Sequence, residues 1–126
     1  MKKIIETTNA PAPIGPYSQA IHYHGMVYTS GQIAIDPQTG ALNNSSVAQE
    51  TKQIMENLKA VLAAAGLTFE QVIKTTIFLT NMDDFGLVNS IYGAYFNEAS
   101  APARETVQVV RLPKDVRVEI SMIAGQ

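Results

Sequence analysis

Residues 102–123 read PARETVQVVRLPKDVRVEISMI, and the organisation of the whole chain follows from how this stretch folds. Apolar and polar side chains alternate in TVQV at 106–109 and again in RVEISM at 117–122. An alternation of period two is typical of strands that bury one face and expose the other. The stretch therefore predicts two half-buried β-strands.

The segment between these strands favours a tight reversal, because Leu112–Asp115 contains a proline and an aspartate, both common in turns. With this segment as the turn, Val109 faces Val118 and Gln108 faces Glu119. Apolar residues then pair with apolar ones and polar with polar. We therefore predict a β-hairpin whose register is fixed by this pairing.

Arg104 lies where Pro102-Ala103 leads the chain into the first of these strands, on the same side as Thr106. A guanidinium presents a rigid fork of donors that matches a carboxylate in two parallel hydrogen bonds. Two ordinary interpretations stand beside this functional one: a solvated arginine at a strand end, or an ion-pair partner for Glu105. The motif by itself does not choose among them.

The N-terminal third of the chain predicts three strands. Residues 2–6 are expected to form a short edge strand, and residues 9–16, with three prolines and a glycine, a loop. Strands are then expected at Ala20–Tyr23 and Met26–Ile35, joined by a turn at His24-Gly25. The chain thus opens on a plain hairpin.

The clearest helix signal begins at Ser46. Ser46 and Gln49 form a capping-box pattern, and Gly66 stands where a left-handed helix end is expected. Apolar residues recur at helical spacing throughout the segment between them. The pattern predicts a helix of about five turns.

A second helix is predicted after a strand at Val72–Thr80. Asp83 or Asp84 would cap it, and it would end near residues 99–102. One face of this helix is apolar and consists of Phe85, Val88, Tyr92, Tyr95 and Phe96.

The order of elements predicts an α+β fold with a single mixed β-sheet and two helices packed on one face. The opposite face of the sheet then has no cover within one chain.

The composition fits one domain, residues 1–126, that buries its core without disulfides or a metal. The chain is 46% hydrophobic and only 16% charged, and it has no cysteine. The low charged share suggests that some surface is buried in an oligomer. The lack of cysteine excludes a thiolate nucleophile and a cysteine-ligated zinc. A formal net charge of −2 argues against nucleic acid as a partner.

The first residues, MKKIIE, are basic but lack the apolar run of a signal peptide. No stretch approaches the length of a membrane span. We therefore expect a cytoplasmic protein with no membrane partner.

His22 and His24 are the only histidines and would share one side of a strand. They could bind a metal, but no third ligand is evident, so we expect a structural or solvent role and no metal site. The chain also lacks a phosphate-binding glycine loop and a nucleophile elbow.

Separate blocks of the sequence are similar to the RidA/YjgF/YER057c/UK114 family of reactive-intermediate (imine) deaminases. These blocks are IGPYSQA at 14–20, TSGQI at 29–33, GL at 66–67, KTTIF at 74–78, DFGLVN at 84–89, PAR at 102–104, VQVVRLPKD at 107–115 and VEI at 118–120. Because so many blocks occur in the right order, the chain is identified as a member of that family.

The resemblance implies a fold similar to chorismate mutase of the Bacillus type, assembled as a homotrimer. It implies that Arg104 binds the substrate carboxylate and that Glu119 positions or activates water. It also implies that Tyr17, Ser30, Gly31, Asn89 and Thr106 line the substrate-binding pocket, Thr106 through its backbone amide.

Ordinary roles remain open for three of these residues. Glu119 could be a surface carboxylate or a partner for Arg117, Tyr17 an anchor for the proline-rich loop, and Asn89 an exposed helix amide.

One residue departs from the family pattern, since Glu105 replaces the small residue that usually follows the arginine. Adjacent side chains of a strand point to opposite faces, so we expect Glu105 to turn away from Arg104.

The predicted hairpin places Arg104 opposite Ile123, about 13 Å along the strand from Glu119. This is too far for both residues to touch one small substrate. A bulge, the length of the two side chains or a subunit interface would have to close the gap.

The implied activity is a cofactor-free hydrolysis of 2-imino acids and their enamine tautomers, such as 2-aminoacrylate/2-iminopropanoate and 2-iminobutanoate, to 2-oxo acids and ammonia. The alternative is a regulatory trimer that binds small carboxylate ligands and has little catalytic activity. Ribonuclease roles have been attributed to relatives, but the sequence pI of about 5.6 argues against one here.

Overall fold

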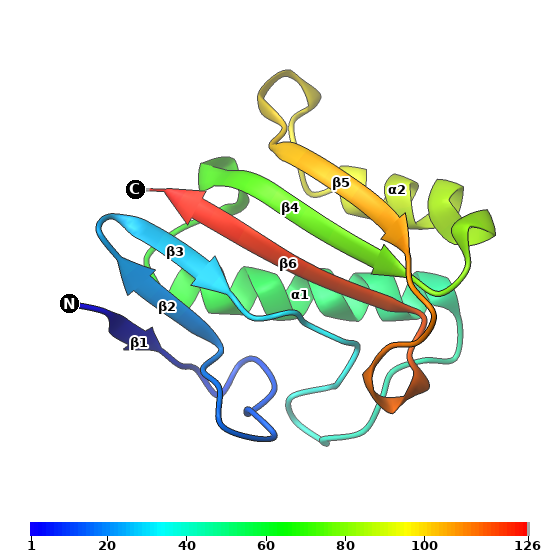
Figure 1. The fold of residues 1–126 in the computed structure, drawn as a ribbon, viewed down its shortest axis with the longest axis horizontal. Helices are drawn as coiled ribbons and strands as arrows, with labels where there is room; N and C mark the ends of the chain where they lie inside the picture. The colour runs from blue at the N-terminus through cyan, green and yellow to red at the C-terminus, as the bar shows by residue number, and fades with distance from the viewer. Residues whose placement is uncertain (126) are drawn as a thin grey trace.

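The structure, a computed structural model, describes residues 1–125 and is built on one mixed sheet of six strands in the order β1-β2-β3-β6-β4-β5 (Figure 1). The strands are β1 (Lys3–Ile5), β2 (Ala20–Tyr23), β3 (Met26–Thr29), β4 (Val72–Leu79), β5 (Ala103–Gln108) and β6 (Val118–Gly125). Neighbouring strands are antiparallel except β4 and β5, which are parallel. This strand set confirms the predicted mixed sheet.

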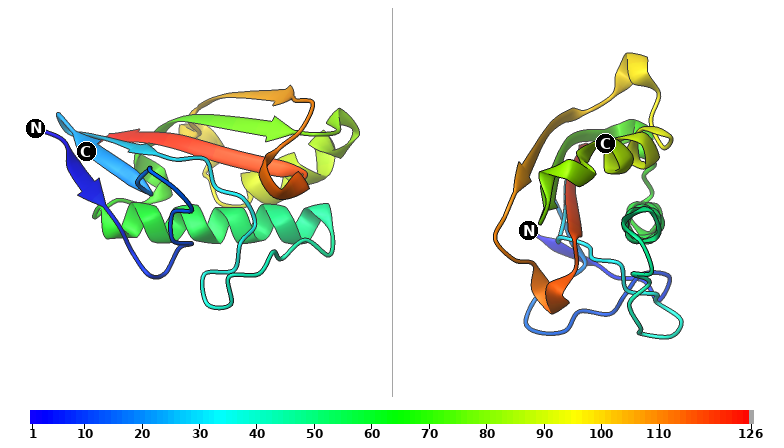
Figure 2. Two further views of the ribbon diagram at one scale, coloured as in Figure 1. Left: turned by 60° about the horizontal axis from the view of Figure 1, so that its bottom comes forward. Right: turned by 90° about the vertical axis from the view of Figure 1, so that its right-hand side faces the viewer.

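Two α-helices, α1 (Val47–Ala64) and α2 (Phe85–Gly93), lie on the same face of the sheet (Figure 2). The described residues also contain four 3₁₀ turns: Phe69–Gln71, Met82–Asp84, Glu98–Ser100 and Pro113–Asp115. The arrangement confirms the predicted α+β class with both helices on one face.

Helix α1 begins and ends where the sequence predicts. The Ser46 side chain accepts a hydrogen bond from the Gln49 backbone amide at 3.1 Å. Gly66 has a φ of 77°, the left-handed conformation that ends helices at little cost for glycine. The apolar side of the helix is fully buried, with Ile54, Leu58 and Leu62 each 0% exposed.

The core lies between α1 and the central strands. Val118 and Ile120 of β6 and Leu79 of β4 are each 0% exposed, whereas the alternate residues of β6, beginning with Glu119, are only half-buried. The alternation of apolar and polar residues in β6 therefore matches the observed alternation of buried and half-buried side chains, as the sequence predicts.

The predicted hairpin of residues 102–123 is wrong. Strand β4 lies between β5 and β6 and pairs with both. Val109, expected opposite Val118, instead donates its amide to Leu79 of β4 at 2.8 Å. Alternation specifies which face of a strand is buried but not which strand lies beside it, and the apolar β4 completes the centre of the sheet.

Three smaller predictions are also corrected. β3 ends at Thr29 rather than at Ile35. The residues after Thr29 leave the strand, and Gln32 pairs with Ile120 of β6 only as an isolated bridge. The side-chain cap before α2 is Asn81, which accepts from the Asp83 amide, and Asp84 makes no capping bond. Helix α2 ends at Gly93 rather than near residues 99–102.

An ion pair between a buried carboxylate and a partly exposed arginine connects the start of α1 to the start of β6. Glu50 is 0% exposed, and its carboxylate accepts hydrogen bonds from the Arg117 backbone amide at 2.9 Å and from the Arg117 Nε at 2.5 Å. The Arg117 guanidinium also donates to the Asn44 carbonyl. Arg117 is thereby occupied by Glu50 and not by Glu119.

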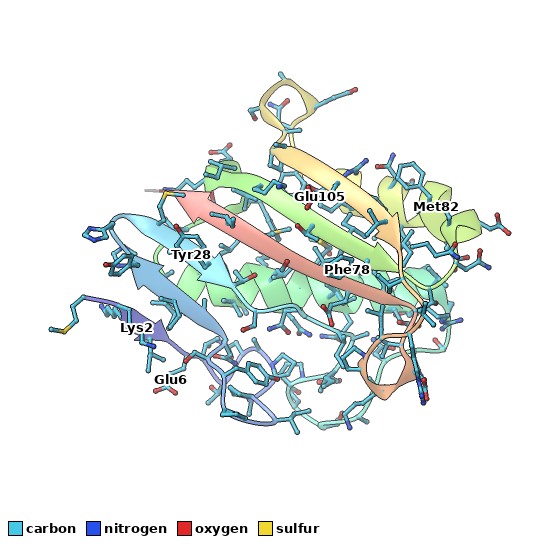
Figure 3. All side chains as sticks on the ribbon, in the orientation of Figure 1. Lys2, Glu6, Tyr28, Phe78, Met82 and Glu105 are labelled. Carbon is cyan, nitrogen blue, oxygen red and sulfur yellow. The ribbon has the colours of Figure 1, made fainter. Side chains whose placement is uncertain are left out.

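The face of the sheet turned away from the helices is the open face. Figure 3 looks onto this face and labels three of its residues, Tyr28, Phe78 and Glu105, on three different strands. Tyr28 is 44% exposed and Phe78 is half-buried. In residues 1–125 no helix is both long and apolar enough to cross a membrane.

Candidate active site

Six of the seven predicted site residues form two groups in the structure, and Thr106 lines neither of the two hollows around them. Four of them line one hollow, the Glu119 cavity, which has a volume of about 530 Å³: Tyr17, Ser30, Gly31 and Glu119. Apolar side chains, among them Ile14 and Ile33, form much of the remaining wall. The N-terminal loop and the start of β6 thus bring together residues about one hundred positions apart.

The Glu119 carboxyl is a candidate proton-transfer group. It is half-buried, and this burial raises its pKa above the usual value because the charged form loses hydration. It forms no ion pair with the residues that the structure describes. A carboxyl group with a raised pKa in a cavity is typical of a general base or acid.

Gly31 provides the space in which Glu119 lies. A Cβ atom at Gly31 would lie 2.6 Å from Oε2 of Glu119 and 2.8 Å from its Cδ, closer than atoms can pack. Gly31 thus has a steric reason to be glycine that does not depend on an unusual φ. The predicted backbone contact of Gly31 with a ligand stays a prediction.

The loop that carries Tyr17 is held in place by hydrogen bonds. The Tyr17 hydroxyl accepts from the Ile14 amide at 3.2 Å, so the ordinary role of loop anchor is observed. The ring also lines the Glu119 cavity, so the two roles coexist. Ser30 donates its hydroxyl to the Ser18 carbonyl at 2.6 Å, which connects the segment after β3 to the same loop.

Sequence reasoning missed two further residues of this cavity. Gln19 is 2% exposed, and its amide bonds the backbone of Thr7, Ala10 and Pro11, so that it organises the whole N-terminal loop. Lys114 lines the cavity from the Pro113–Asp115 turn with a φ of 56°. Both lie inside the sequence blocks that resemble the family, at 14–20 and 107–115, so this resemblance was the signal that could have identified them.

The second group surrounds Arg104 on the helix face of the sheet. The Arg104 Nη1 donates to the Asn89 Oδ1 at 2.6 Å, so Asn89 is not a free helix amide. Both residues line a second hollow of about 510 Å³, the Arg104 cavity, together with Tyr92 and Glu98. Helix α2 and strand β5 therefore bring Arg104 and Asn89 together as predicted.

The Arg104 fork has no carboxylate partner within 4.0 Å among residues 1–125. Glu105 instead pairs with Lys74 at 3.0 Å and accepts a hydrogen bond from Thr76, which lowers its pKa. Both partners lie on the open face. The prediction that Glu105 turns away from Arg104 is confirmed.

Thr106 lies next to the free edge of the sheet. The Val109 amide points to β4, and successive amides of a strand point in opposite directions, so the Thr106 amide points away from β4. The Thr106 Oγ1 is buried and has no hydrogen-bond partner in the described chain. The Thr106 amide is thus not used in the pairing with β4, and its contact with a ligand stays a prediction.

The two groups do not meet within one chain. Arg104 lies level with Thr75 and on the helix face, whereas Glu119 lies level with Phe78 and on the open face. Three residues along the strands and two strand spacings separate their Cα atoms by roughly 14 Å. The predicted register was wrong, but the predicted separation of these two residues persists.

The described residues hold no cluster of three or more His, Cys, Asp or Glu side chains that could hold a metal ion. The side chains that line the two hollows include a guanidinium, a carboxyl with a raised pKa and a phenol.

Comparison with known proteins defines the class. Residues 7–126 match the family model described as Endoribonuclease L-PSP. The chain is 56% identical to RutC family protein slr0709 of Synechocystis over 97% of this chain and 95% of that one. It is 50% identical to the 2-iminobutanoate/2-iminopropanoate deaminases of Mus musculus, over 100% and 93% of the two chains, and of Salmonella typhimurium, over 98% of each.

Solved structures agree. A Rid family protein, YyfA from Yersinia pestis, superposes with a TM-score of 0.97 at 50% identity over 100% of both chains. The crystal structure of E. coli TdcF with bound serine superposes with a TM-score of 0.92 at 47% identity over 98% of both chains. The chain belongs to the RidA/YjgF/YER057c/UK114 family, which includes the 2-iminobutanoate/2-iminopropanoate deaminases.

Proposed function

We propose that this protein hydrolyses 2-imino acids and their enamine tautomers, such as 2-iminopropanoate and 2-iminobutanoate, to 2-oxo acids and ammonia. The observation that carries the proposal is the guanidinium of Arg104, which is exposed and has no carboxylate partner in the described chain. The names of the two deaminases at 50% identity support the same substrate class.

The chemistry requires few groups, because an imine carbon is already electrophilic. Arg104 would bind the substrate carboxylate through its fork. Glu119 would take a proton from water as it attacks the C=N carbon and pass this proton to nitrogen, which gives a carbinolamine. It would then move the hydroxyl proton of the carbinolamine to nitrogen, so that the C–N bond breaks, the C=O bond forms and ammonia leaves. One water is consumed, and the C=N double bond of the imine is replaced by the C=O double bond of the 2-oxo acid. Positioning supplies most of the acceleration.

We propose further that each site lies between two subunits of a homotrimer. One chain separates Arg104 from Glu119 by a strand and places them on opposite faces. A ring of identical subunits can bring the Arg104 group of one copy to the Glu119 group of the next. The unpaired edge of β5 and the open face of the sheet are surfaces on which a neighbouring copy could pack.

Mixing two inactive variants tests both parts of the proposal. Arg104→Ala and Glu119→Gln are each expected to lose 2-iminobutanoate hydrolysis in an assay that couples a threonine dehydratase to detection of ammonia. Subunits refolded together at equal amounts should regain about one quarter of the parent activity, since each shared site draws its two residues independently. No recovery would refute sites shared between subunits. Full activity of either single variant would refute the assigned residue.

A second candidate function is a trimer that binds small carboxylate ligands with little turnover. The serine bound to E. coli TdcF favours it. Saturable binding of serine without any acceleration of imine hydrolysis would establish this function and exclude the first.

A further inference from the structure

We propose that Tyr92 and Phe85 are positioning residues, whose rings hold the Arg104 guanidinium ready for a carboxylate. The Arg104 Cζ lies 5.2 Å from the centroid of the Tyr92 ring and 5.6 Å from that of Phe85. A guanidinium within about 6 Å of a ring face is attracted by the π-electrons. This inference rests on the proposed function, because it assigns a task to rings that contact the proposed carboxylate-binding arginine.

The two rings and Asn89 come from one side of α2. Phe85, Asn89 and Tyr92 are four and three residues apart, which places them on one face of a helix. That face gives Arg104 a ring, an amide oxygen and a second ring. Asn89 accepts from Nη1, and the other guanidinium donors have no partner in the described chain. The arrangement fixes the arginine and leaves donors available for a ligand.

The Tyr92 ring is itself anchored. It is 5% exposed, and its hydroxyl bonds the Oγ1 of Thr75, a residue of β4 that is 0% exposed. Thr75 lies directly beside Arg104 in the sheet register. Burial raises the pKa of the Tyr92 hydroxyl, while the bond to Thr75 and the charge of Arg104 act in the opposite direction. The ring therefore cannot turn away from the arginine without breaking a buried hydrogen bond.

Holding Arg104 should affect binding more than the chemical step. A free arginine side chain loses rotational freedom when it binds a ligand, and preorganisation removes part of that cost. Losing one ring should therefore raise KM for the carboxylate-bearing substrate and leave kcat nearly unchanged.

The test compares three ring variants with a matched aromatic control. Tyr92→Leu and Phe85→Leu should each raise KM for 2-iminobutanoate about three- to tenfold, with kcat within about twofold of the parent. Tyr92→Phe keeps the ring and should restore most of the affinity. The control is Phe69→Leu, because Phe69 packs against Tyr95 and Phe96, whereas the rings found at Arg104 are those of Phe85 and Tyr92. This variant should keep the parent KM.

A variant cycle separates positioning from general destabilisation. In an Arg104→Ala background, Phe85→Leu should not weaken the binding of the product 2-oxobutanoate any further, because the ring would have no arginine to hold. Phe85 is half-buried, so its variant carries the test even if Tyr92→Leu folds poorly.

The failures are distinguishable. Failure of the parent enzyme to hydrolyse 2-iminobutanoate would contradict the proposed function. Full activity of Arg104→Ala would refute the role assigned to Arg104, and with it this inference. An inactive Arg104→Ala enzyme together with a parent-like KM in Tyr92→Leu and Phe85→Leu would overturn only the inference. An equal loss of affinity on Phe85→Leu with and without Arg104 would also overturn it.

Discussion

The contact between Gly31 and Glu119 allows the role of the carboxyl to be tested without changing the carboxyl itself. In Gly31→Ala the new Cβ would lie 2.6 Å from Oε2 of Glu119. Ordinary contacts begin near 3.4 Å, so the carboxyl must move by about 0.8 Å, the difference between these two distances. The flexible glutamate can give way, so the variant should fold.

The expected loss follows from this displacement. A shift of about 1 Å in a catalytic group can cost roughly a hundredfold in rate. We therefore expect kcat for 2-iminobutanoate hydrolysis to fall by one to two orders of magnitude in Gly31→Ala, as measured by ammonia release in the coupled dehydratase assay. Thermal unfolding should change by only a few degrees.

The control is the same substitution at a glycine with open space. Nothing lies within 4 Å of a Cβ at Gly86, so Gly86→Ala should keep the parent rate and gain slightly in helix stability. In a Glu119→Gln background, Gly31→Ala should add little further loss. A Gly31→Ala enzyme with parent kcat would refute the view that the position of the Glu119 carboxyl matters.

Four further predictions concern other charged groups. Arg104→Ala should lower kcat/KM by roughly two to four orders of magnitude while leaving the fold intact, and Arg104→Lys should recover little, because the ammonium lacks the fork; steady-state kinetics and circular dichroism check both. Burial raises the pKa of Glu119, so Glu119 becomes protonated at a higher pH than an ordinary glutamate as the pH falls. The decrease of kcat/KM on the acid side should therefore begin at a higher pH than for an ordinary glutamate, and it should be absent in Glu119→Gln. Glu105→Ser should keep kcat/KM within an order of magnitude, because Glu105 pairs with Lys74 on the open face, and a large gain in turnover would contradict this. Arg117→Met should destabilise the protein by about 3 kcal/mol in urea unfolding, since it leaves the buried Glu50 carboxylate unpaired, and Glu50→Gln/Arg117→Met should lose less.

Much of the fold could be predicted because its signals are local. The cap at Ser46, the apolar period of α1 and the alternation of β6 each depend on neighbours in sequence, and the structure agrees with all three. The position of β5 beside β4 depends on a parallel pairing between segments far apart in the chain. No local pattern specifies such a pairing, and the hairpin prediction failed there.

The features of the candidate site could also be predicted where they depend on local sequence, and not where they join distant segments. The direction of Glu105 was predicted correctly although its neighbouring strand was not, because side-chain direction depends only on the strand's own period. The contacts of Gly31 with Glu119 and of Arg104 with Phe85 and Tyr92 join distant segments. Resemblance to the family pointed to Gly31, Glu119 and Arg104, but it could not supply these contacts.

The separation of Arg104 from Glu119 is compatible with a simple reaction. Each residue is positioned by its own surroundings. Asn89 bonds Arg104, and the lack of a side chain at Gly31 leaves room for the Glu119 carboxyl in its cavity. A reaction that needs only a bound carboxylate and one proton-transfer group does not require both to come from the same chain. If the two groups meet across an interface, as we propose, assembly itself brings them to the substrate, and each chain has only to keep its own group in position.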